Sequence, residues 1–504
     1  MRKNYILSID QGTTGTRAVL FDEALTQVCT SYREHEQISR RPGWTEHDPE
    51  EIYRNTCLTA AETLGAARKM GISPEAVRCM GIANQGETVM AWDSVSGKPL
   101  GNAVVWHCTR SEGIAKGLRK LPGFPELVRE RTGLQVDAYF SATKILWLRE
   151  KLPQVRAAEA AGRIRYGTLD SWLIWKLTGG RRHVTDVTTA SRTMLFNIHG
   201  LDWDGEILER LGIERRFLPE VLSNCADFGT ASLAVGDSVL EIPIAGSIVD
   251  QQAALLGQFC FEKGMAKATY GTGCFVLMNA GERPVFSSHG LLTSVGWKIG
   301  ETVCYVLDGA VYMAGAVMQW LRDGLQILEG YEKLDEYALS LKGNDGVYFV
   351  TAFSGLSAPV WDAAARGMLI GLTTNSTRAH VVRAALESVA YQVCELAECL
   401  REDTGIALRE LKVDGGLTKS RFLNQFQADL LNLPVVLTES CEATAKGAAM
   451  LAGLGAGLYQ GLSQLFTYQI TDNTYIPKMS EGERERLLHD WRCAVDRARG
   501  WEER

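Results

Sequence analysis

The chain opens with two apolar runs separated by a polar turn, a pattern that predicts a β-hairpin. The first run lies in residues 5–9 (YILSI) and the second in residues 18–21 (AVLF). Glycine and threonine dominate the residues between them, which is the composition of a tight turn. A turn of this kind presents backbone amides at a strand end, where a ligand can reach them. Asp10 is the exception, an acid at the end of an apolar strand.

The second half of the chain repeats this device. Residues 266–279 (AKATYGTGCFVLMN) again predict a strand, a Gly-Thr turn and a strand, and residues 302–308 predict a third strand, as residues 28–38 do after the first hairpin. Two such halves suggest a duplicated nucleus with a cleft between them. Chance is the alternative explanation, because Gly-Thr turns between apolar strands are common in sheets.

Helical spacing of apolar residues dominates most of the remaining chain. Asp48 and Pro49 predict the start of a helix that runs to Met70, with Asp48 as its N-cap and Pro49 in its first turn. The alternation of helices with strands predicts an α/β layered fold. Further helices are expected within residues 111–176, 201–211, 379–402 and 481–501, and further strands within residues 77–91, 103–106 and 346–352.

Two later strands end in residues that can carry chemistry. The apolar run at residues 242–249 ends in Asp250, and the strand at residues 411–414 breaks at a double glycine before a helix that begins near Ser420. The double glycine presents backbone amides, as the two hairpins do. We place a domain boundary near Gly257, which divides the chain into residues 1–257 and 258–504.

Composition narrows the class of protein. The 504 residues are 46% hydrophobic and 22% charged, which is typical of a soluble globular protein with two or more domains. A net charge of −7 and the lack of a Lys/Arg-rich run argue against nucleic acid or an anionic membrane as partner. The first apolar run is too short for a signal peptide or a membrane span, so we expect no membrane insertion and a cytoplasmic location.

The common nucleotide-binding motifs are missing from the sequence. Gly97-Lys98 lacks the upstream glycine of a Walker loop, and no strand is followed by a Gly-x-Gly-x-x-Gly helix start. A nucleotide could still be held by several short Gly-Thr turns that converge across a cleft, with an acid fixing Mg²⁺.

Several stretches of the chain resemble the FGGY family of carbohydrate kinases, within the superfamily of actin, sugar kinases and heat-shock ATPases. Residues 139–150 (YFSATKILWLRE) and 367–387 (GMLIGLTTNSTRAHVVRAALE) resemble the two family signatures. Residues 191–204, 270–279 and 312–323 are similar to the glycerol kinase subgroup. The similarity spans essentially the whole chain.

This resemblance implies two ribonuclease-H-like domains with an active site in the cleft between them. It also implies an ATP-dependent kinase that transfers the γ-phosphate to a terminal hydroxyl of glycerol or a related small polyol. Gly15 stands where many relatives carry Ser, and Ser420 where glycerol kinases often carry Asn. The residues that the resemblance assigns to the nucleotide and its phosphates are Thr13, Thr14, Gly15, Arg17, Thr272, Gly315, Gln319, Gly416 and Ser420.

The resemblance assigns the catalytic base to Asp250 and the Mg²⁺ side of the site to Asp10 and Asp250. Transfer of a phosphoryl group to an alcohol needs a positioned hydroxyl, a base for its proton and cations for the phosphate charge. From composition alone, carboxylates that merely cap turns would be the favoured interpretation. Val249 stands where relatives usually carry Gly, and a β-branched residue does not readily adopt φ > 0. The turn before Asp250 therefore either stays in the β region or is reshaped.

An acceptor pocket is also implied, with polar groups for hydroxyls and aromatic faces for the C–H side of a polyol. Each aromatic residue taken singly would be assigned to the core. The chain leaves open whether the enzyme is a monomer or a homo-oligomer. The pocket residues are Gly86, Glu87, Trp106, Tyr139, Gln251 and Phe275.

Gly86 is the main departure in this pocket, because glycerol kinases typically carry Arg before the Glu. The loss of two charge-assisted hydrogen bonds, about 1.5–3 kcal/mol each, favours a four- or five-carbon polyol or a ketose as acceptor. In the competing hypothesis, a water or Arg110 fills the gap and glycerol stays the substrate. A hypothesis of another class is a chaperone-like ATPase regulator with no small acceptor, against which Glu87, Trp106 and Tyr139 argue.

Overall fold

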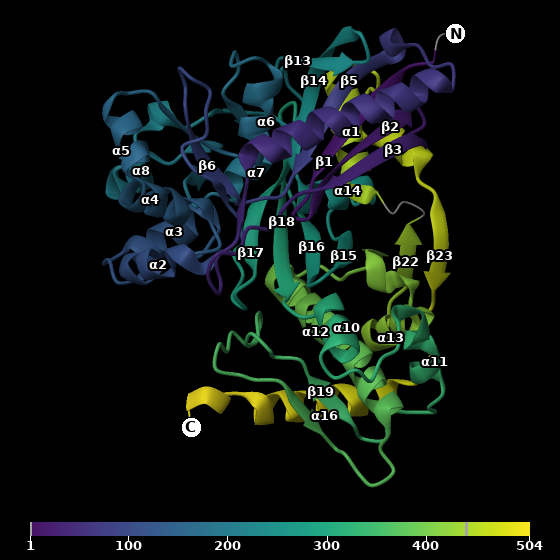
Figure 1. Cartoon of the computed structure of the whole chain (residues 1–504). Coiled ribbons are helices and arrows are strands. Elements are labelled where there is room, and N and C mark those ends of the chain that lie inside the picture. The colour runs from purple at the N-terminus through teal and green to yellow at the C-terminus, as the bar shows by residue number, and fades with distance from the viewer. Residues whose placement is uncertain (1–2, 439–441, 504) are drawn as a thin grey trace.

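The computed structural model describes residues 3–438 and 442–503, and a six-stranded mixed sheet forms the core of its N-terminal half (Figure 1). β1 pairs antiparallel with β2, which pairs antiparallel with β3. On its other side β1 runs parallel to β5, β5 runs parallel to β14, and β13 closes that edge. We call this the first sheet. In the order β13-β14-β5-β1-β2-β3 its strands span Thr230–Val235, Ser238–Val249, Val77–Asn84, Tyr5–Gln11, Gly15–Asp22 and Gln27–Glu34.

The C-terminal half contains a second sheet with the same central arrangement. β15 pairs antiparallel with β16, which pairs antiparallel with β18, and β21 and β22 continue from β15 in parallel. β15 thus corresponds to β1, and β21 to β5. The duplicated nucleus predicted from the two Gly-Thr turns is confirmed in the strand order. In the order β17-β18-β16-β15-β21-β22-β23 the strands span Leu292–Ile299, Thr302–Val311, Cys274–Gly281, Ala266–Tyr270, Leu411–Asp414, Val435–Thr438 and Thr471–Tyr475.

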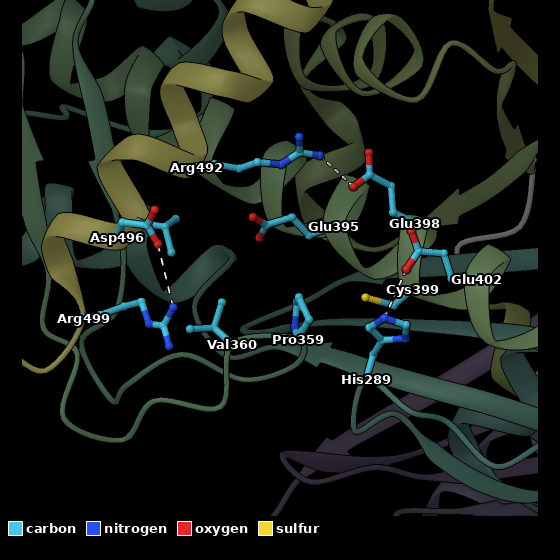
Figure 2. Close-up of a pocket in the computed structure, with 11 residues that line it drawn as sticks. His289, Pro359, Val360, Glu395, Glu398, Cys399, Glu402, Arg492, Asp496 and Arg499 are labelled. Atoms are coloured by element: carbon cyan, nitrogen blue, oxygen red, sulfur yellow. Dashed lines mark hydrogen bonds and ion pairs between the residues drawn. The ribbon is translucent and has the colours of Figure 1, made fainter.

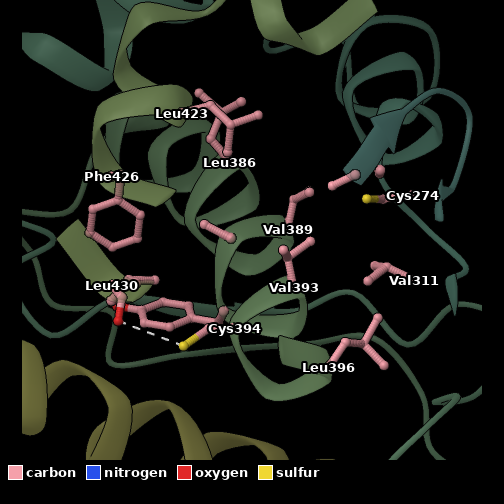
Figure 3. Close-up of a cluster of buried hydrophobic side chains, with 14 of the residues drawn as sticks. Cys274, Val311, Leu386, Val389, Val393, Cys394, Leu396, Leu423, Phe426 and Leu430 are labelled. Carbon is pink, nitrogen blue, oxygen red and sulfur yellow. Dashed lines mark hydrogen bonds between the residues drawn. The ribbon is translucent and has the colours of Figure 1, made fainter. Parts of the chain in front are cut away.

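One long helix covers each sheet. α1 (Pro49–Lys69) packs on β2 and β3, and the Asp48 side chain caps it by accepting from the backbone N of Glu50 at 3.0 Å. α12 (Arg378–Thr404) packs on β16 and β18 in the same manner. Figure 3 shows Val389 and Val393 of α12 directed toward the strands of the second sheet. The helices expected at residues 48–70 and 379–402 are therefore present.

Two helices lie where the sheets meet. α9 (Asp250–Gly257) follows β14, and α14 (Ala443–Gly455) comes from the C-terminal half but packs on α9, β14, β5 and β1. Their backbones are in direct contact, because a Cβ on Gly257 would lie 1.9 Å from the carbonyl O of Ala443. A Cβ on Gly81 would likewise lie 2.2 Å from the carbonyl O of Ala448. Only glycine permits this approach, so α14 fixes the C-terminal half against the first sheet.

A smaller layered unit is appended to the first sheet on the left in Figure 1. Its four-stranded sheet has the order β4-β7-β6-β8, and these strands span Glu46–His47, Ala103–Val104, Val89–Asp93 and Ile164–Thr168. Its helices are α2 (Glu112–Arg119), α3 (Phe124–Thr132), α4 (Ser141–Lys151), α5 (Pro153–Ala160), α6 (Leu169–Leu177), α7 (Val187–Ser191) and α8 (Gly205–Leu211).

The remaining elements are short, apart from α16. The helix expected within residues 481–501 is α16, and its Leu487, Leu488, Trp491 and Val495 are all buried. No helix in residues 3–438 or 442–503 is long and apolar enough to cross a membrane. The remaining helices and strands are β9 (Val184–Asp186), β10 (Phe196–Asn197), β11 (Asp202–Trp203), β12 (Glu220–Leu222), β19 (Tyr348–Val350), β20 (Met368–Ile370), α10 (Gly315–Asp323), α11 (Leu334–Leu339), α13 (Arg421–Leu431), α15 (Leu462–Leu465) and α16 (Glu481–Ala498).

Three local predictions differ from the structure. The stretch at residues 111–176 is not helical throughout, because β8 pairs with β6 inside it. The helix expected over residues 201–211 begins only at Gly205, where Asp204 caps it and accepts from the backbone N of Ile207. β17 was not predicted. β8 and β17 pair with β6 and β18, so cross-strand pairing decides their state more than local propensity does.

Candidate active site

The turn between β1 and β2 carries the first predicted phosphate contacts. It is closed by a hydrogen bond from the backbone N of Gly12 to the carbonyl O of Gly15 at 2.9 Å. Thr14 is exposed, and its hydroxyl lies 3.4 Å from the hydroxyl of Tyr32. A Cβ on Gly15 would lie 2.6 Å from the Tyr32 ring and 2.5 Å from the carbonyl O of Arg33. The turn has no room for a larger residue at Gly15 while Tyr32 stays in place.

Trp106 connects this turn to the predicted acceptor pocket. Its indole Nε1 donates to the hydroxyl of Thr13 at 3.0 Å. Its ring meets Tyr139 edge-on at a centroid distance of 5.5 Å, and Phe275 at 6.3 Å. Phe275 belongs to β16 of the second sheet, whereas Trp106 and Tyr139 belong to the appended unit. The three predicted aromatic residues therefore converge from both halves of the chain.

Glu87, which is also assigned to the predicted acceptor pocket, is paired with an arginine that the sequence analysis missed. Its carboxylate accepts from Nε of Arg192 at 2.7 Å, and both side chains are buried. Nη1 of Arg192 continues to Asp308 at 3.1 Å and to the Ser294 hydroxyl at 2.7 Å, both in the second sheet. Burial raises the pKa of Glu87 to about 7, although Arg192 opposes the rise. The only indication of this buried cation in the sequence is the single arginine, Arg192, in the run DVTTASRTMLF.

Arg110 does not take the place that the sequence analysis considered for it. Its guanidinium pairs with Glu46 and lies against the rings of Trp44 and Trp147, 4.4 and 4.8 Å from their centroids. The cation that contacts Glu87 is Arg192. Of the two ways considered for filling the gap at Gly86, a water or Arg110, the structure engages Arg110 elsewhere.

Gly86 and Val249 are in contact. A Cβ on Gly86 would lie 2.9 Å from Cγ2 of Val249 and 3.9 Å from Cγ of Arg192. Val249 has φ −71° and ψ 147°, so the chain before Asp250 stays in the β region. Of the two outcomes that the sequence left open for this turn, the unreshaped one is observed.

Asp250 and Asp10 lie at the same edge of the first sheet. Asp250 follows β14 directly and opens α9, and its carboxylate accepts from the backbone N of Gln251 at 2.7 Å. Asp10 lies near the end of β1, and β1, β5 and β14 are parallel neighbours. The carboxyl ends of parallel strands are where open α/β sheets bind ligands. Burial, and then the charge of Asp250, raise the pKa of Asp10 to about 7.

Lys267 is a second buried cation that the sequence analysis missed. It lies in β15, and its Nζ donates to the side-chain oxygen of Gln251 at 2.6 Å and to the Thr269 hydroxyl at 2.8 Å. Burial raises the pKa of Asp250, and the charge of Lys267 is the largest effect that opposes it. Its partner in the neighbouring strand, Lys412, donates to the carbonyl O of Gln258 after the end of α9. A lysine inside each of two apolar strands was the signal here.

The predicted nucleotide contacts of the second half come together at the end of β15. The backbone N of Gly315, at the start of α10, donates to the carbonyl O of Gly271 at 2.9 Å. The backbone N of Ala316 donates to the carbonyl O of Thr272 at 3.0 Å. A Cβ on Gly415 would lie 2.4 Å from the carbonyl O of Tyr270, so the double glycine also meets this strand.

The other three residues predicted to contact the nucleotide in the second half, Gln319, Gly416 and Ser420, lie on or next to α10 and α13. Gln319 is exposed on α10, one turn after Gly315. Ser420 caps α13, since its hydroxyl accepts from the backbone N of Leu423 at 3.1 Å and donates to Asp335. Gly416 opens a short 3-10 turn just before it. These residues lie around the start of α10 and α13, beside the β15 turn.

Arg17 already has an anionic partner. Its guanidinium pairs with Glu442 next to the start of α14, and lies 5.1 Å from the centroid of the Tyr32 ring. Glu442 also raises the pKa of Asp10. The side chain predicted to contact phosphate thus holds a carboxylate in this structure.

A separate pocket of about 370 Å³ lies between α12 and α16 (Figure 2). Glu398, Glu402 and Arg492 line it, with His289 at its edge. The charged groups are paired with one another, Arg492 with Glu398 and His289 with Glu402. The residues described as lining this pocket include none of the predicted site residues.

Comparison with known proteins places the chain in a family. Residues 5–257 match the family model described as "FGGY family of carbohydrate kinases, N-terminal domain". Residues 266–456 match the corresponding C-terminal domain.

Individual relatives match over their full length. Glycerol kinase 2 of Thermotoga maritima is 49% identical over 99% of this chain and 100% of its own. A glycerol kinase of Caldanaerobacter subterraneus is 47% identical over 99% of both chains. Among solved structures, Plasmodium falciparum glycerol kinase with ADP superposes with a TM-score of 0.91 at 37% identity and covers 98% of both chains.

Proposed function

The chain belongs to the FGGY family of carbohydrate kinases, and on this basis we propose that it transfers the γ-phosphoryl group of ATP to a terminal hydroxyl of glycerol. The observation that carries the proposal is the position of Asp250. It is a carboxylate at a strand end, and its charge raises the pKa of both Asp10 and Glu87.

Asp250 acts as the general base in this proposal. Its ionised form accepts the proton of the attacking hydroxyl as the new O–P bond forms. Burial disfavours that ionised form, and the charge of Lys267 is the largest effect that opposes burial. Lys267 also orients Gln251, whose amide can then face the acceptor. Glu87, fixed by Arg192, offers a carboxyl oxygen to a second hydroxyl of the polyol.

Mg²⁺ fits the residues beside Asp250. Asp10 and Asp250 are carboxylates close enough for the charge of one to raise the pKa of the other, and a cation between them removes that repulsion. No three acidic, histidine or cysteine side chains in the described residues form a metal cage. This agrees with Mg²⁺, which usually binds one or two carboxylates and keeps water and phosphate ligands. When bound, Mg²⁺ would neutralise phosphate charge, while Asp10 holds it in place.

ATP would meet the chain at the three turns that present backbone amides. These are the turn after β1, the turn after β15 and the double glycine at Gly415-Gly416. Amides in such turns favour anionic oxygens without any Lys-rich loop.

We also propose the domain boundary near Gly257 and a cytoplasmic location, as expected from the sequence.

Glycerol is preferred over a longer acceptor for two reasons. The relatives at 47–49% identity carry the name glycerol kinase, and Val249 fills the volume beside Gly86 that the missing Arg side chain would otherwise leave free. Arg192 supplies a buried cation at Glu87, which weakens the argument that the pocket lacks positive charge. A four- or five-carbon polyol or ketose stays the alternative acceptor.

The test is ADP production from ATP in the presence of glycerol, erythritol, xylitol, ribitol and a pentulose. We expect glycerol to give the highest kcat/KM and Asp250→Asn to abolish the stimulated activity, with ATP binding retained. A longer acceptor that wins by a wide margin would contradict glycerol as substrate. ATP hydrolysis that no acceptor stimulates would instead support the regulator hypothesis.

A further inference from the structure

The contact between Gly86 and Val249 joins two residues that directly precede functional side chains. Gly86 precedes Glu87, and Val249 precedes Asp250. A Cβ on Gly86 would lie 2.9 Å from Cγ2 of Val249, closer than side chains pack. The backbone of Gly86 lies outside the left-handed region, so its conformation does not require glycine. Gly86 is required by space alone.

Val249 is held firmly and cannot easily make room. It is 2% exposed and stands opposite Asn84 in the pairing of β14 with β5. Its backbone N donates to the hydroxyl of Thr188 at 3.0 Å. Thr188 is itself anchored, because its backbone N and its hydroxyl both donate to the buried carboxylate of Asp186.

The other side of the contact is fixed as well. Glu87 adopts φ 41°, an unusual conformation for a residue with a side chain, and Arg192 holds its carboxylate at 2.7 Å. The Glu87 carbonyl accepts from the hydroxyl of Ser141 at 2.9 Å. A side chain at residue 86 would therefore push on Val249, and the residue next in the chain is Asp250.

We propose that Gly86 and Val249 form a coupled pair that positions Asp250 and limits the length of the acceptor, an inference that rests on the proposed kinase function. The side chain of Val249 fills the space next to Gly86. A larger residue at position 86 requires a smaller one at position 249. With Gly86 kept, removing volume at position 249 opens space between Glu87 and Asp250, where a longer acceptor can enter.

A double-mutant cycle tests the pair with Gly86→Ala, Val249→Ala and the double variant. We expect Gly86→Ala to lower kcat with glycerol by about 10–100-fold, because small displacements of a reacting group are costly. The KM for ATP should change far less, since neither Gly86 nor Val249 is among the residues assigned to the nucleotide. In the Val249→Ala background the same Gly86→Ala change should lower kcat by no more than about threefold.

One further measurement and one control variant distinguish an effect on the position of Asp250 from a general loss of stability. Val249→Ala should raise the erythritol to glycerol ratio of kcat/KM, which a merely structural role would not change. Gly65→Ala, in α1 with no atom within 4 Å of the new Cβ, is the matched control and should behave as wild type.

The outcomes are distinguishable from failure of the proposed function. If Gly86→Ala does not fold, the double variant should recover folding, and a double variant that stays unfolded overturns the pair. If the wild type has no kinase activity, the same cycle is read in urea midpoints, where rescue by Val249→Ala is still expected. Equal losses from Gly86→Ala in both backgrounds, or no loss in either, would overturn the inference.

Discussion

Replacing Arg192 by Met should destabilise the protein strongly at alkaline pH and weakly at acidic pH. The guanidinium lies buried between the carboxylates of Glu87, at 2.7 Å, and Asp308, at 3.1 Å. Met keeps much of the apolar stem but removes the cation, which leaves two buried carboxylates without their partner. Removing one member of a buried ion pair costs about 3–5 kcal/mol of the free energy of unfolding. We expect a loss of that order near neutral pH.

The pH dependence follows from the direction of the pKa shifts. Burial already raises the pKa of Glu87 to about 7 and raises that of Asp308, and Arg192 opposes both rises. Without Arg192 both pKa values in the folded state move further up. A carboxylic acid whose pKa is higher in the folded than in the unfolded protein leaves the free energy of unfolding undiminished below its unfolded pKa, about 4. That free energy falls as the pH rises through the folded pKa. Each such carboxylate changes stability by up to about 1.4 kcal/mol per pH unit.

The measurement is urea unfolding of wild type and Arg192→Met at about pH 5.5 and about pH 8. The difference in free energy of unfolding should be several kcal/mol at the higher pH and should shrink markedly at the lower. Arg192→Met with Glu87→Gln is the matched control, since removing one orphaned charge should recover part of the loss at about pH 8. A loss that is the same at both pH values would refute the electrostatic reasoning.

Three further predictions concern the metal, the helix contact and the positioning network. Burial raises the pKa of Asp10 to about 7, so the affinity of the protein for Mn²⁺ in the presence of ADP should fall as the pH drops below 7. Calorimetry in two buffers should show that metal binding releases a proton. Asp10→Asn should remove this pH dependence. Gly257→Ala should lower the urea midpoint, whereas Gly117→Ala, which meets no atom within 4 Å, should not. Asp186→Asn should reduce kcat more than it raises the KM for glycerol, because Asp186 anchors Thr188 and thereby β14; equal effects on both constants would contradict this.

Local patterns predicted the fold well where an element's own residues decide it. The two hairpins, the capped helix after Asp48 and the long helix at residues 379–402 follow from turn composition and apolar spacing, and they are present. The repeat of Gly-Thr turns also predicted two similar sheets. β8 and β17 were missed, because a short strand depends on the partner beside it rather than on its own sequence.

The candidate site was less accessible from the sequence, because its key contacts join distant positions. Arg192 and Asp308 are 116 residues apart, and Lys267 lies on a different sheet from Asp250. The two departures noted in the sequence, Gly86 and Val249, looked independent. Only packing reveals that they share one volume, since no pattern along the chain relates two strand ends so far apart.

The charge on Asp250 depends on how the two sheets are placed against each other. Burial in the first sheet favours the protonated acid, which cannot act as a base, and the largest opposing effect comes from Lys267 in β15 of the second sheet. Arg192 crosses between the halves in the other direction, from α7's end to Asp308. Moving the sheets apart would weaken both contacts together. Lys267 and Asp308 therefore support Asp250 and Arg192 only while the halves are in contact, which links phosphoryl transfer to the closed arrangement.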